Sequence, residues 1–444
     1  MSLIVSVLFV LMIMVFILEK NFSGLITLIL LSLLGNMFFF NFFGSRIIIF
    51  QLISLLYFPF IIKYMPSKKI LSIISGIKLE YILLILLGVL YGFIIPWDDN
   101  STVRAWNQIA SGKAIVALVN IFSNILLVYL TIFLFLKNRV HLIKFLNILS
   151  VLVIIISVTA FLDKFFNYPI YKLFFGGNSI TPHIKGRLLG FSHEPRALGR
   201  MMVQIWVYLF IYKTHGFKFK YSNLSLIMGF LVILFSFSFS SYFIFLLSII
   251  IFFKKNIFKI KLTSLLVISL GLYLCSIFIL KNDIVKNSFL YKYKITTEGR
   301  GESSQMHGEP KIFTQFEIFD RAALNFLYRN PEFLFFGTGP NLISIPASKY
   351  VSDDSKETMS GLIVGIPNSS IINLISRSGI IGLFLYLIVF IKVYRYLGEN
   401  KLLKNLFIIV VANFIFVNTS WIYFSIGFVL AQQFNTNLNN KIKC

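Results

Sequence analysis

Long apolar stretches recur along this chain, each separated from the next by a few polar or basic residues. A helix needs ~20 mainly apolar residues to cross a bilayer, and about 13 stretches approach that length, or about 12 if the short first or last pair forms one span. The pattern predicts an all-α protein, a polytopic transmembrane helical bundle. The predicted spans lie at about 2–18, 23–42, 46–62, 79–95, 114–136, 142–162, 196–212, 222–236, 238–253, 262–280, 368–391, 405–418 and 419–433.

These spans divide the chain into three parts. We expect transmembrane helices in 1–280, a long extracytoplasmic loop in 281–367, and further transmembrane helices with a cytoplasmic tail in 368–444. The first part also contains an outer basic loop at 163–200. The first span has neither a basic segment before it nor a small-residue cleavage site, so we expect it to be retained as a helix.

Composition supports membrane insertion. The chain is 57% hydrophobic and only 13% charged, with a mean hydropathy of +0.85, which leaves too little polar surface to cover a soluble globule. Cysteine indicates no disulfide framework, because Cys275 lies inside a span and Cys444 is the last residue. No spacing typical of a metal site is present, so we expect neither a metal nor another cofactor.

The distribution of basic residues predicts the orientation. The long loop is neutral, with ten basic and ten acidic side chains in 281–366, and loops of this length cross a membrane regardless of charge. The short loops alternate, and those rich in Lys and Arg fall on one side, which we assign to the cytoplasm. The net charge of +24 is spread thinly over these inner loop ends. It therefore favours contact with anionic membrane lipids and not with nucleic acid.

The outer basic loop is an exception to this rule. Its charged side chains are Asp163, Lys164, Lys172, Lys185, Arg187, Glu194, Arg196 and Arg200. An outward-facing cationic pocket suits the head group of a polyanionic substrate. The structural alternative is that these side chains cap a helix and extend to the membrane interface.

Two features extend this basic region into the membrane. Pro195 is well placed as a first helical residue, and Arg196, Arg200 and Gln204 follow at every fourth position on one helical face. Arg377 lies within the span 368–391, ~20 Å from the inner boundary at about 1.5 Å per residue. An arginine at that depth indicates function, with extension of the side chain to the interface as the alternative.

The long loop contains an amphipathic pattern. Apolar residues recur at helical spacing over 312–329 and predict a helix that lies on the membrane surface or packs over the spans. Glu317, Asp320 and Arg321 fall on its polar side, where Glu317 and Arg321 are spaced to pair with each other. The sequence Gly337-Thr338-Gly339-Pro340 predicts a plain turn.

Several of these segments together resemble a known family. The outer segment Gly186-Arg187-Leu188-Leu189-Gly190-Phe191-Ser192-His193-Glu194-Pro195 of a polytopic protein resembles the O-antigen polymerase (Wzy) family. Later segments are similar to the long loop and following helix of that family and of the related O-antigen ligases: 321–325, Arg329-Asn330-Pro331, Phe336-Gly337-Thr338-Gly339-Pro340 and Ser378-Gly379-Ile380-Ile381-Gly382-Leu383. The resemblance covers roughly 180–390 by motif.

The chain departs from these families at two places. Ligases carry a histidine near the end of the long loop, where this chain has Pro367 and Asn368 while His307 lies far upstream. This difference favours a polymerase over a ligase. A Ser-Arg pair between two mid-chain helices is also missing, because Phe239-Ser240-Ser241-Tyr242 contains no arginine.

The resemblance implies an enzyme of the bacterial inner membrane whose active site faces the periplasm. Such a polymerase joins oligosaccharide repeat units, each carried on a polyprenyl diphosphate, into O-antigen or a related surface polysaccharide. A hydroxyl of one unit attacks the anomeric carbon of the other, and arginines in place of a metal stabilise the diphosphate that leaves. Its partners are the lipid-linked oligosaccharide, membrane lipids and, as a further candidate, a chain-length regulator protein.

We assign roles on this basis. The hypothesis places Glu194, Arg187 and His193 at the catalytic centre. The residues expected to bind diphosphate or glycan are Arg196, Arg200, Arg321, Arg377 and Asn368. Glu194 would deprotonate the attacking hydroxyl, with His193 as the rival base, while Arg187, Arg200 and Arg377 would contact the diphosphate.

Two other functions remain as alternatives. An O-antigen ligase would use the same lipid-linked donor. A flippase for lipid-linked oligosaccharides would also bind the diphosphate, but transporters place that site near the midplane between repeated halves. Here ionisable residues are scarce deep in the spans, no repeat is visible, and charge gathers at the outer surface. The pattern therefore favours an enzyme that acts there.

Overall fold

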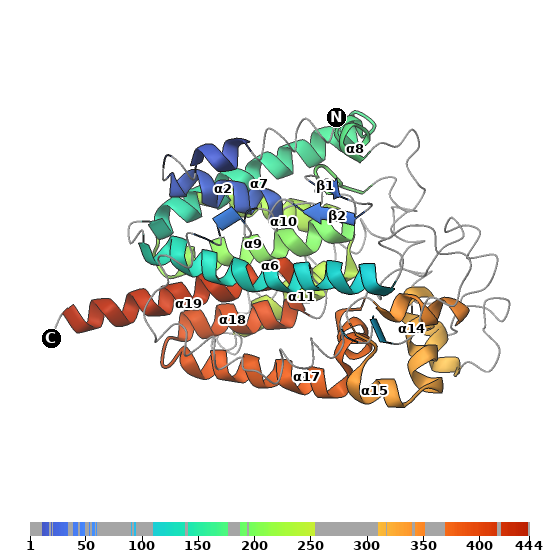
Figure 1. The fold of residues 1–444 in the computed structure, drawn as a ribbon. Coiled ribbons are helices and arrows are strands. Elements are labelled where there is room, and N and C mark those ends of the chain that lie inside the picture. Colours follow the sequence, from blue (N-terminus) through green and yellow to red (C-terminus); the bar gives the residue numbers. More distant parts are fainter. Residues whose placement is uncertain are drawn as a thin grey trace. The chain divides into compact units, whose positions relative to one another are not determined.

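The structure of the 444-residue chain is a computed structural model. It describes residues 11–16, 19, 21–33, 39–42, 45–48, 53, 56–57, 59, 90, 93–94, 110–137, 141–175, 187–192, 195–253, 310–316, 318–339, 342–350, 369–414 and 419–442. The described part is almost entirely helical, as the hydropathy pattern predicts (Figure 1). The predicted span 262–280, and most of 2–18, 46–62 and 79–95, lie outside the described residues.

Three of the described helices are long and apolar enough to cross a membrane. They cover Ala110–Leu136, Leu142–Phe165 and Ile371–Tyr396, which are 27, 24 and 26 residues long. At about 1.5 Å per residue each exceeds the ~30 Å of a bilayer core. The protein is therefore a multi-pass helical membrane protein. Shorter apolar helices at Phe22–Leu31, Ser222–Phe235 and Ser240–Phe252 also match predicted spans.

The described chain forms two compact units. The first unit comprises 1–76, 119–251 and 389–444, and the second comprises 77–118 and 252–388. The elements assigned wholly or mainly to the first are α2 (Phe22–Leu33), β1 (Phe39–Phe42), β2 (Ser45–Ile48), α6 (Ala110–Lys137), α7 (His141–Phe165), α8 (Pro169–Phe175), α9 (Pro195–Thr214), α10 (Ser222–Phe235), α11 (Phe239–Phe253), α18 (Lys401–Phe414) and α19 (Thr419–Ile442). Those of the second are η4 (Lys311–Gln315), α14 (Ile318–Arg329), α15 (Glu332–Phe336), η5 (Leu342–Ser344), η6 (Pro346–Tyr350) and most of α17 (Ser370–Tyr396).

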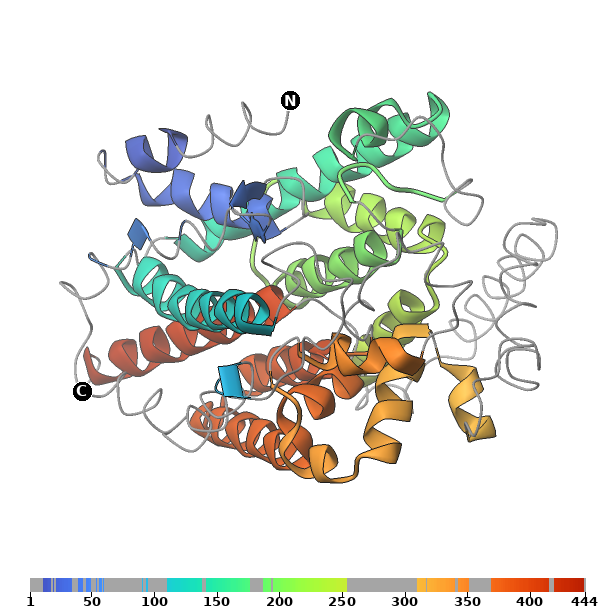
Figure 2. The same ribbon diagram turned by 45° about the vertical axis from the view of Figure 1, so that its right-hand side comes forward.

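Helices α7, α9 and α10 lie side by side in the first unit, as both ribbon views show (Figures 1 and 2). Side-chain hydrogen bonds join these helices in addition to apolar contacts. The Ser150 hydroxyl of α7 donates to the Ser225 hydroxyl of α10 at 2.8 Å. The Trp206 indole N–H of α9 donates to the Leu226 carbonyl of α10 at 2.9 Å. Such bonds stabilise helix pairs where no water competes for the same groups.

An aromatic cluster forms much of the first unit's core. The Phe428 ring of α19 lies 4.8 Å from the Phe135 ring, 4.7 Å from Phe145 and 5.4 Å from Tyr208, measured between centroids. These rings come from α6, α7 and α9, so one side chain connects four helices. Edge-on and tilted contacts of this kind stabilise the fold beyond the burial of apolar area.

Two predicted spans, 23–42 and 46–62, differ from the structure, because 39–42 and 45–48 form strands. The stretch 23–42 contains most of helix α2, and its end forms strand β1, which pairs antiparallel with β2 at the start of the predicted span 46–62. Phe39 opposes Ile48, and Asn41 opposes Arg46. Aromatic residues on either side of Asn41 favour a strand as much as a helix, so hydropathy alone does not distinguish the two.

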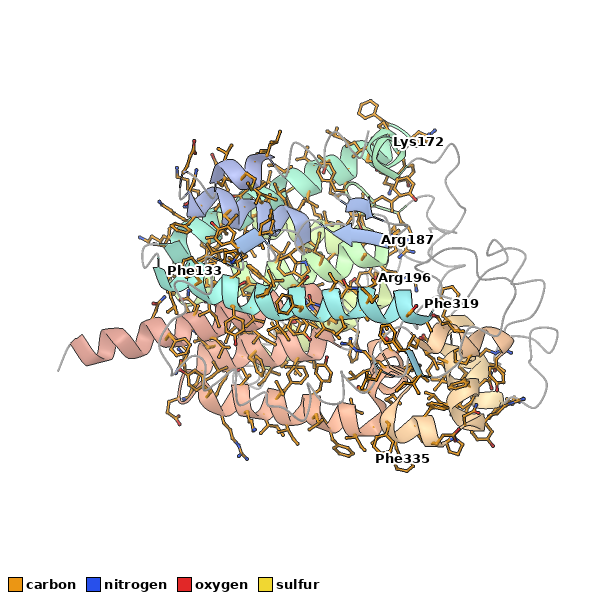
Figure 3. The ribbon with its side chains drawn as sticks, in the orientation of Figure 1. Phe133, Lys172, Arg187, Arg196, Phe319 and Phe335 are labelled. Atoms are coloured by element: carbon orange, nitrogen blue, oxygen red, sulfur yellow. The ribbon has the colours of Figure 1, made fainter. Side chains whose placement is uncertain are left out.

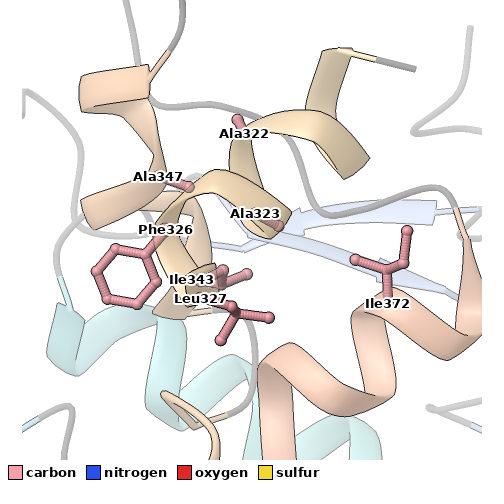
Figure 4. Close-up of a cluster of buried hydrophobic side chains, with 7 residues drawn as sticks. All are labelled: Ala322, Ala323, Phe326, Leu327, Ile343, Ala347 and Ile372. Atoms are coloured by element: carbon pink, nitrogen blue, oxygen red, sulfur yellow. The ribbon is translucent and has the colours of Figure 1, made fainter. Parts of the chain in front are cut away.

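The second unit buries the apolar face of α14 (Figure 4). Ala323, Phe326 and Leu327 pack with Ile343 of η5 and Ile372 of α17. The sequence left open whether this amphipathic helix lies on the membrane surface or packs over the spans. The contact with Ile372 supports the second arrangement, because Ile372 belongs to the first turn of the apolar helix α17.

Candidate functional site

The arginines of the outer basic loop are held at the N-terminal end of α9. Arg187 precedes α9 and its side chain binds the end of α10. Its Nε donates to the Ser236 carbonyl at 3.0 Å, and its Nη2 donates to the Phe237 carbonyl at 2.8 Å. A guanidinium group suits this task because its donors lie in a fixed plane and can engage two acceptors together. Arg187 thus has a structural role at the α10–α11 turn.

The segment 187–192 is also fixed from the side of α7. The Tyr168 hydroxyl donates to the Arg187 carbonyl at 3.0 Å. Gly190 adopts a φ of +52° beside Ala160 of α7, where an added Cβ would lie 3.0 Å from the Ala160 Cα. Glycine is required at such a position because it tolerates both the left-handed backbone and the close approach. The segment 187–192 is therefore held in place against α7.

Arg196 and Arg200 lie in the first two turns of α9, which follows the segment 187–192 along the chain. Both side chains are half-buried, and the Arg200 Nε donates to the Arg196 carbonyl at 3.3 Å. Between them, Gly199 packs so closely against the α10–α11 turn that a Cβ would overlap the Ser236 and Ser241 hydroxyl oxygens. Arg187 binds the same turn through the Ser236 carbonyl. Figure 3 labels Arg187 and Arg196, which lie at the end of the unit where α9 begins.

This arrangement concentrates positive potential. The first N–H groups of α9 have no partner within the helix and carry the positive end of its dipole. Pro195 as the first residue costs no hydrogen bond there, and the structure confirms the predicted helix start. Two arginines within the first two turns add full charges. An anion with several oxygens, such as a phosphate ester, matches this combination of donors.

Asp163 supports the site from the end of α7. Its side chain is fully buried, and its Oδ1 accepts the N–H of Ile170 at 2.7 Å and the N–H of Tyr171 at 3.1 Å. These two bonds cap the start of α8. Two positive φ angles, at Asn167 and Tyr168, form the turn that brings α8 back to the carboxylate. Asp163 therefore shapes the loop and serves as an anchor.

We expect Asp163→Ala to destabilise the protein. The substitution removes the acceptor for two half-buried N–H groups, at a cost of about 1–2 kcal/mol in the free energy of unfolding. Asp163→Asn keeps a carbonyl oxygen and should lose less. The thermal midpoint of the purified protein measures both. Equal midpoints for the wild type and Asp163→Ala would contradict the capping role.

The second unit places Asp320 and Arg321 differently from the prediction. The sequence put both on the polar side of the amphipathic helix, but the structure buries them to 5% and 3% exposure. The Asp320 Oδ1 accepts the N–H of Ser369 at 2.9 Å and so fixes the start of α17. Helical periodicity cannot predict this burial, because the covering segment is remote in sequence.

Arg377 lies next to a break in α17. The helix is interrupted at Gly379, which has a φ of +67° and a ψ of −174°. The Thr338 N–H donates to the Ser376 carbonyl at 2.7 Å, and the Gly339 N–H donates to the Arg377 carbonyl at 3.1 Å. The turn that contains Thr338 and Gly339, which the sequence predicted to be a plain turn, therefore donates to two α17 carbonyls next to the break. A new helical segment begins after Gly379, two residues beyond Arg377.

The predicted site residues therefore fall into three groups. Arg187, Arg196 and Arg200 come together in the first unit, while Arg321 and Arg377 belong to the second. Glu194, His193 and Asn368 lie outside the described residues, as does Glu317. Within the described ranges, no three His, Cys, Asp or Glu side chains are grouped as a metal site would require.

Sequence reasoning missed the partners of the arginines. The α10–α11 turn contributes Ser236 and Ser241, and its carbonyls bind Arg187. Serines near this turn and an arginine from another loop therefore lie together. The serine repeat over 236–241 is visible in the sequence, but nothing local indicates which side chain packs on it.

Comparison with known protein families and with curated proteins finds no match to this chain. The assignment of function therefore rests on the residues and on the geometry described above.

Proposed function

We propose that this protein is a glycosyltransferase that polymerises oligosaccharide repeat units carried on polyprenyl diphosphate. The observation that carries the proposal is the pair Arg196 and Arg200 at the start of α9. They flank Gly199, which packs against the α10–α11 turn to which Arg187 is bound, and the Arg200 Nε donates to the Arg196 carbonyl. The charge pattern predicts that this end of α9 faces the periplasm. A membrane-anchored diphosphate would present its charge at that depth.

The proposed reaction is a substitution at the anomeric carbon. A hydroxyl oxygen of the acceptor repeat forms a bond to that carbon, and the bond from the carbon to the diphosphate oxygen breaks. The leaving polyprenyl diphosphate takes the electron pair of the broken bond. The hydroxyl proton passes to Glu194, with His193 as the alternative base. Arg196 and Arg200 stabilise the charge that develops on the leaving diphosphate.

Arg187 acts mainly as a positioning residue in this proposal. Two of its nitrogen atoms donate to main-chain carbonyls, so its charge is held in place while the turn is held against α9. Arg321 and Arg377 are proposed as further contacts for diphosphate or glycan. The position of Arg377 supports this, because it lies two residues before Gly379, after which a helical segment starts and a positive dipole end is expected.

A gel of surface polysaccharide from source cells lacking the gene tests the proposal. We expect carrier lipid capped by a single repeat, with the polymer ladder returning on complementation. Loss of every repeat from the surface while long polymer accumulates on its carrier would indicate a ligase. Single repeats retained on the cytoplasmic face would indicate a flippase. Either of these two results would contradict the polymerase.

A further inference from the structure

A polar stripe continues along α9 far beyond its arginines. Gln204, Tyr208 and Tyr212 follow Arg196 and Arg200 at every fourth position of one continuous helix. Their side chains are buried to 3%, 2% and 1% exposure. Residues at this spacing share one helical face, so polar groups line nearly the full length of α9.

The polar atoms of this stripe lack protein partners. Both amide atoms of Gln204 and the hydroxyl groups of Tyr208 and Tyr212 make no hydrogen bond to any described residue. The Ser425 side chain of α19 approaches the Tyr208 hydroxyl without completing a bond within the described part of the chain. Helix α18 packs against α9 and α19. Its buried Asn413 side-chain amide likewise makes no hydrogen bond to any described residue.

Such groups are costly in a membrane protein. A buried donor or acceptor without a partner has lost its hydrogen bonds to water, and lipid offers no replacement. Two of the groups are tyrosines whose rings are fixed by Phe428, at 5.4 Å from Tyr208 and 6.3 Å from Tyr212. The rings cannot readily turn away to reach other partners. The stripe therefore indicates a small polar ligand bound between the helices.

The spacing of the stripe fits water. Four residues rise about 6 Å along a helix. Two hydrogen bonds through one water molecule span about 5.6 Å. A single water can therefore bridge each successive pair of groups. Among the described residues of the stripe below Arg200, all side chains are neutral amides, phenols or hydroxyls, which suits water better than an ion.

We propose that α9 binds a file of structural water that extends from Arg200 to Tyr212 through the interior of the first unit. Ser425 gives the file a contact on α19. This inference does not depend on the proposed reaction. As a consequence, water within the membrane-spanning part of α9 solvates the Arg200 guanidinium. This solvation lowers the free-energy cost of placing an arginine in the helix at that depth.

Substituted-cysteine labelling tests the hydration. A thiol reacts as the thiolate, which forms readily only where water is present. The labelling uses native membranes and a protein in which Cys275 and Cys444 are replaced by serine. The reagent is methyl methanethiosulfonate, which reaches thiols through lipid and through water alike. We expect Gln204→Cys to react at least roughly tenfold faster than Ile205→Cys. Ile205 is the matched control because it is equally deep and fully buried.

Removing single hydroxyl groups gives an independent test that preserves packing. Tyr208→Phe and Tyr212→Phe each remove one polar atom and keep the ring. If the hydroxyl binds water, the thermal midpoint should fall. Tyr242→Phe provides a control for a bonded hydroxyl, because the Tyr242 hydroxyl donates to the Leu234 carbonyl at 2.5 Å.

Two results would overturn the proposal. One is equal labelling of Gln204→Cys and Ile205→Cys. The other is a higher thermal midpoint for both phenylalanine variants, since removing a dry, unsatisfied hydroxyl stabilises a protein. Fast labelling combined with a lowered midpoint supports the file of water.

Discussion

Arg200→Ala is expected to reduce polymer formation by roughly 100-fold while the protein remains folded and abundant. Removing one preorganised donor from a developing negative charge commonly has an effect of about this size. Arg200 is half-buried on the first turns of α9, so its charge acts in surroundings less polar than water. Arg200→Lys should also lose activity, because an ammonium group cannot make the two parallel bonds of a guanidinium.

The matched control for this prediction is Lys218→Ala. Lys218 is exposed in the connection between α9 and α10, so the variant loses the same charge at a distant place. Polymer length on gels, normalised to protein abundance, compares the variants. Normal ladders from Arg200→Ala at wild-type abundance would remove Arg200 from the site.

Gly379→Ala is expected to reduce the stability of the second unit by more than 3 kcal/mol. The backbone at Gly379, with φ +67° and ψ −174°, lies in a region open almost only to glycine, at a cost of about 1–3 kcal/mol for another residue. In addition, a Cβ there would overlap the Phe335 carbonyl of α15. The overlap involves main-chain atoms, which cannot move aside without disturbing the turn at Thr338.

Gly216→Ala separates these two effects. Gly216 has a φ of +85°, but a Cβ there meets no atom within 4 Å. This variant therefore carries the conformational cost alone and should lose only about 1 kcal/mol. The thermal midpoints of both purified variants report the difference. Equal midpoints would show that the close approach of Phe335 to Gly379 does not contribute.

The helices were the part of the structure most accessible from sequence. The predicted spans 142–162 and 196–212 correspond to α7 (His141–Phe165) and α9 (Pro195–Thr214). Apolar runs longer than a bilayer needs have few alternatives to a helix. The stretch 23–42 shows the limit, because its aromatic end satisfies a helix and a strand equally well and the structure forms β1 there.

The sequence predicted residues of the candidate site, but it did not predict which residues they contact. The spacing of Arg196 and Arg200 placed both on one face of α9, and the structure confirms a continuous helix. The bonds of Arg187 to Ser236 and Phe237 were not predictable, because the partners lie 49 and 50 residues away. Local pattern carries no information about such distant partners.

The break in α17 was missed for a related reason. The span 368–391 reads as one apolar helix, and a single glycine is tolerated in such a helix. The break is stabilised by a distant turn, in which Thr338 donates to the Ser376 carbonyl, 38 residues later, and Gly339 donates to the Arg377 carbonyl. The sequence contains both partners but gives no sign of their contact.

Reconstitution tests the central claim most directly. Purified protein in liposomes would receive a polyprenyl-diphosphate-linked repeat unit as its sole substrate, and products would be separated by length. We predict chains of two or more repeats, with one polyprenyl diphosphate released for each bond formed and with Arg200→Ala strongly impaired. Single repeats left unchanged by folded protein, with a wild-type thermal midpoint, would contradict the assignment as a polymerase.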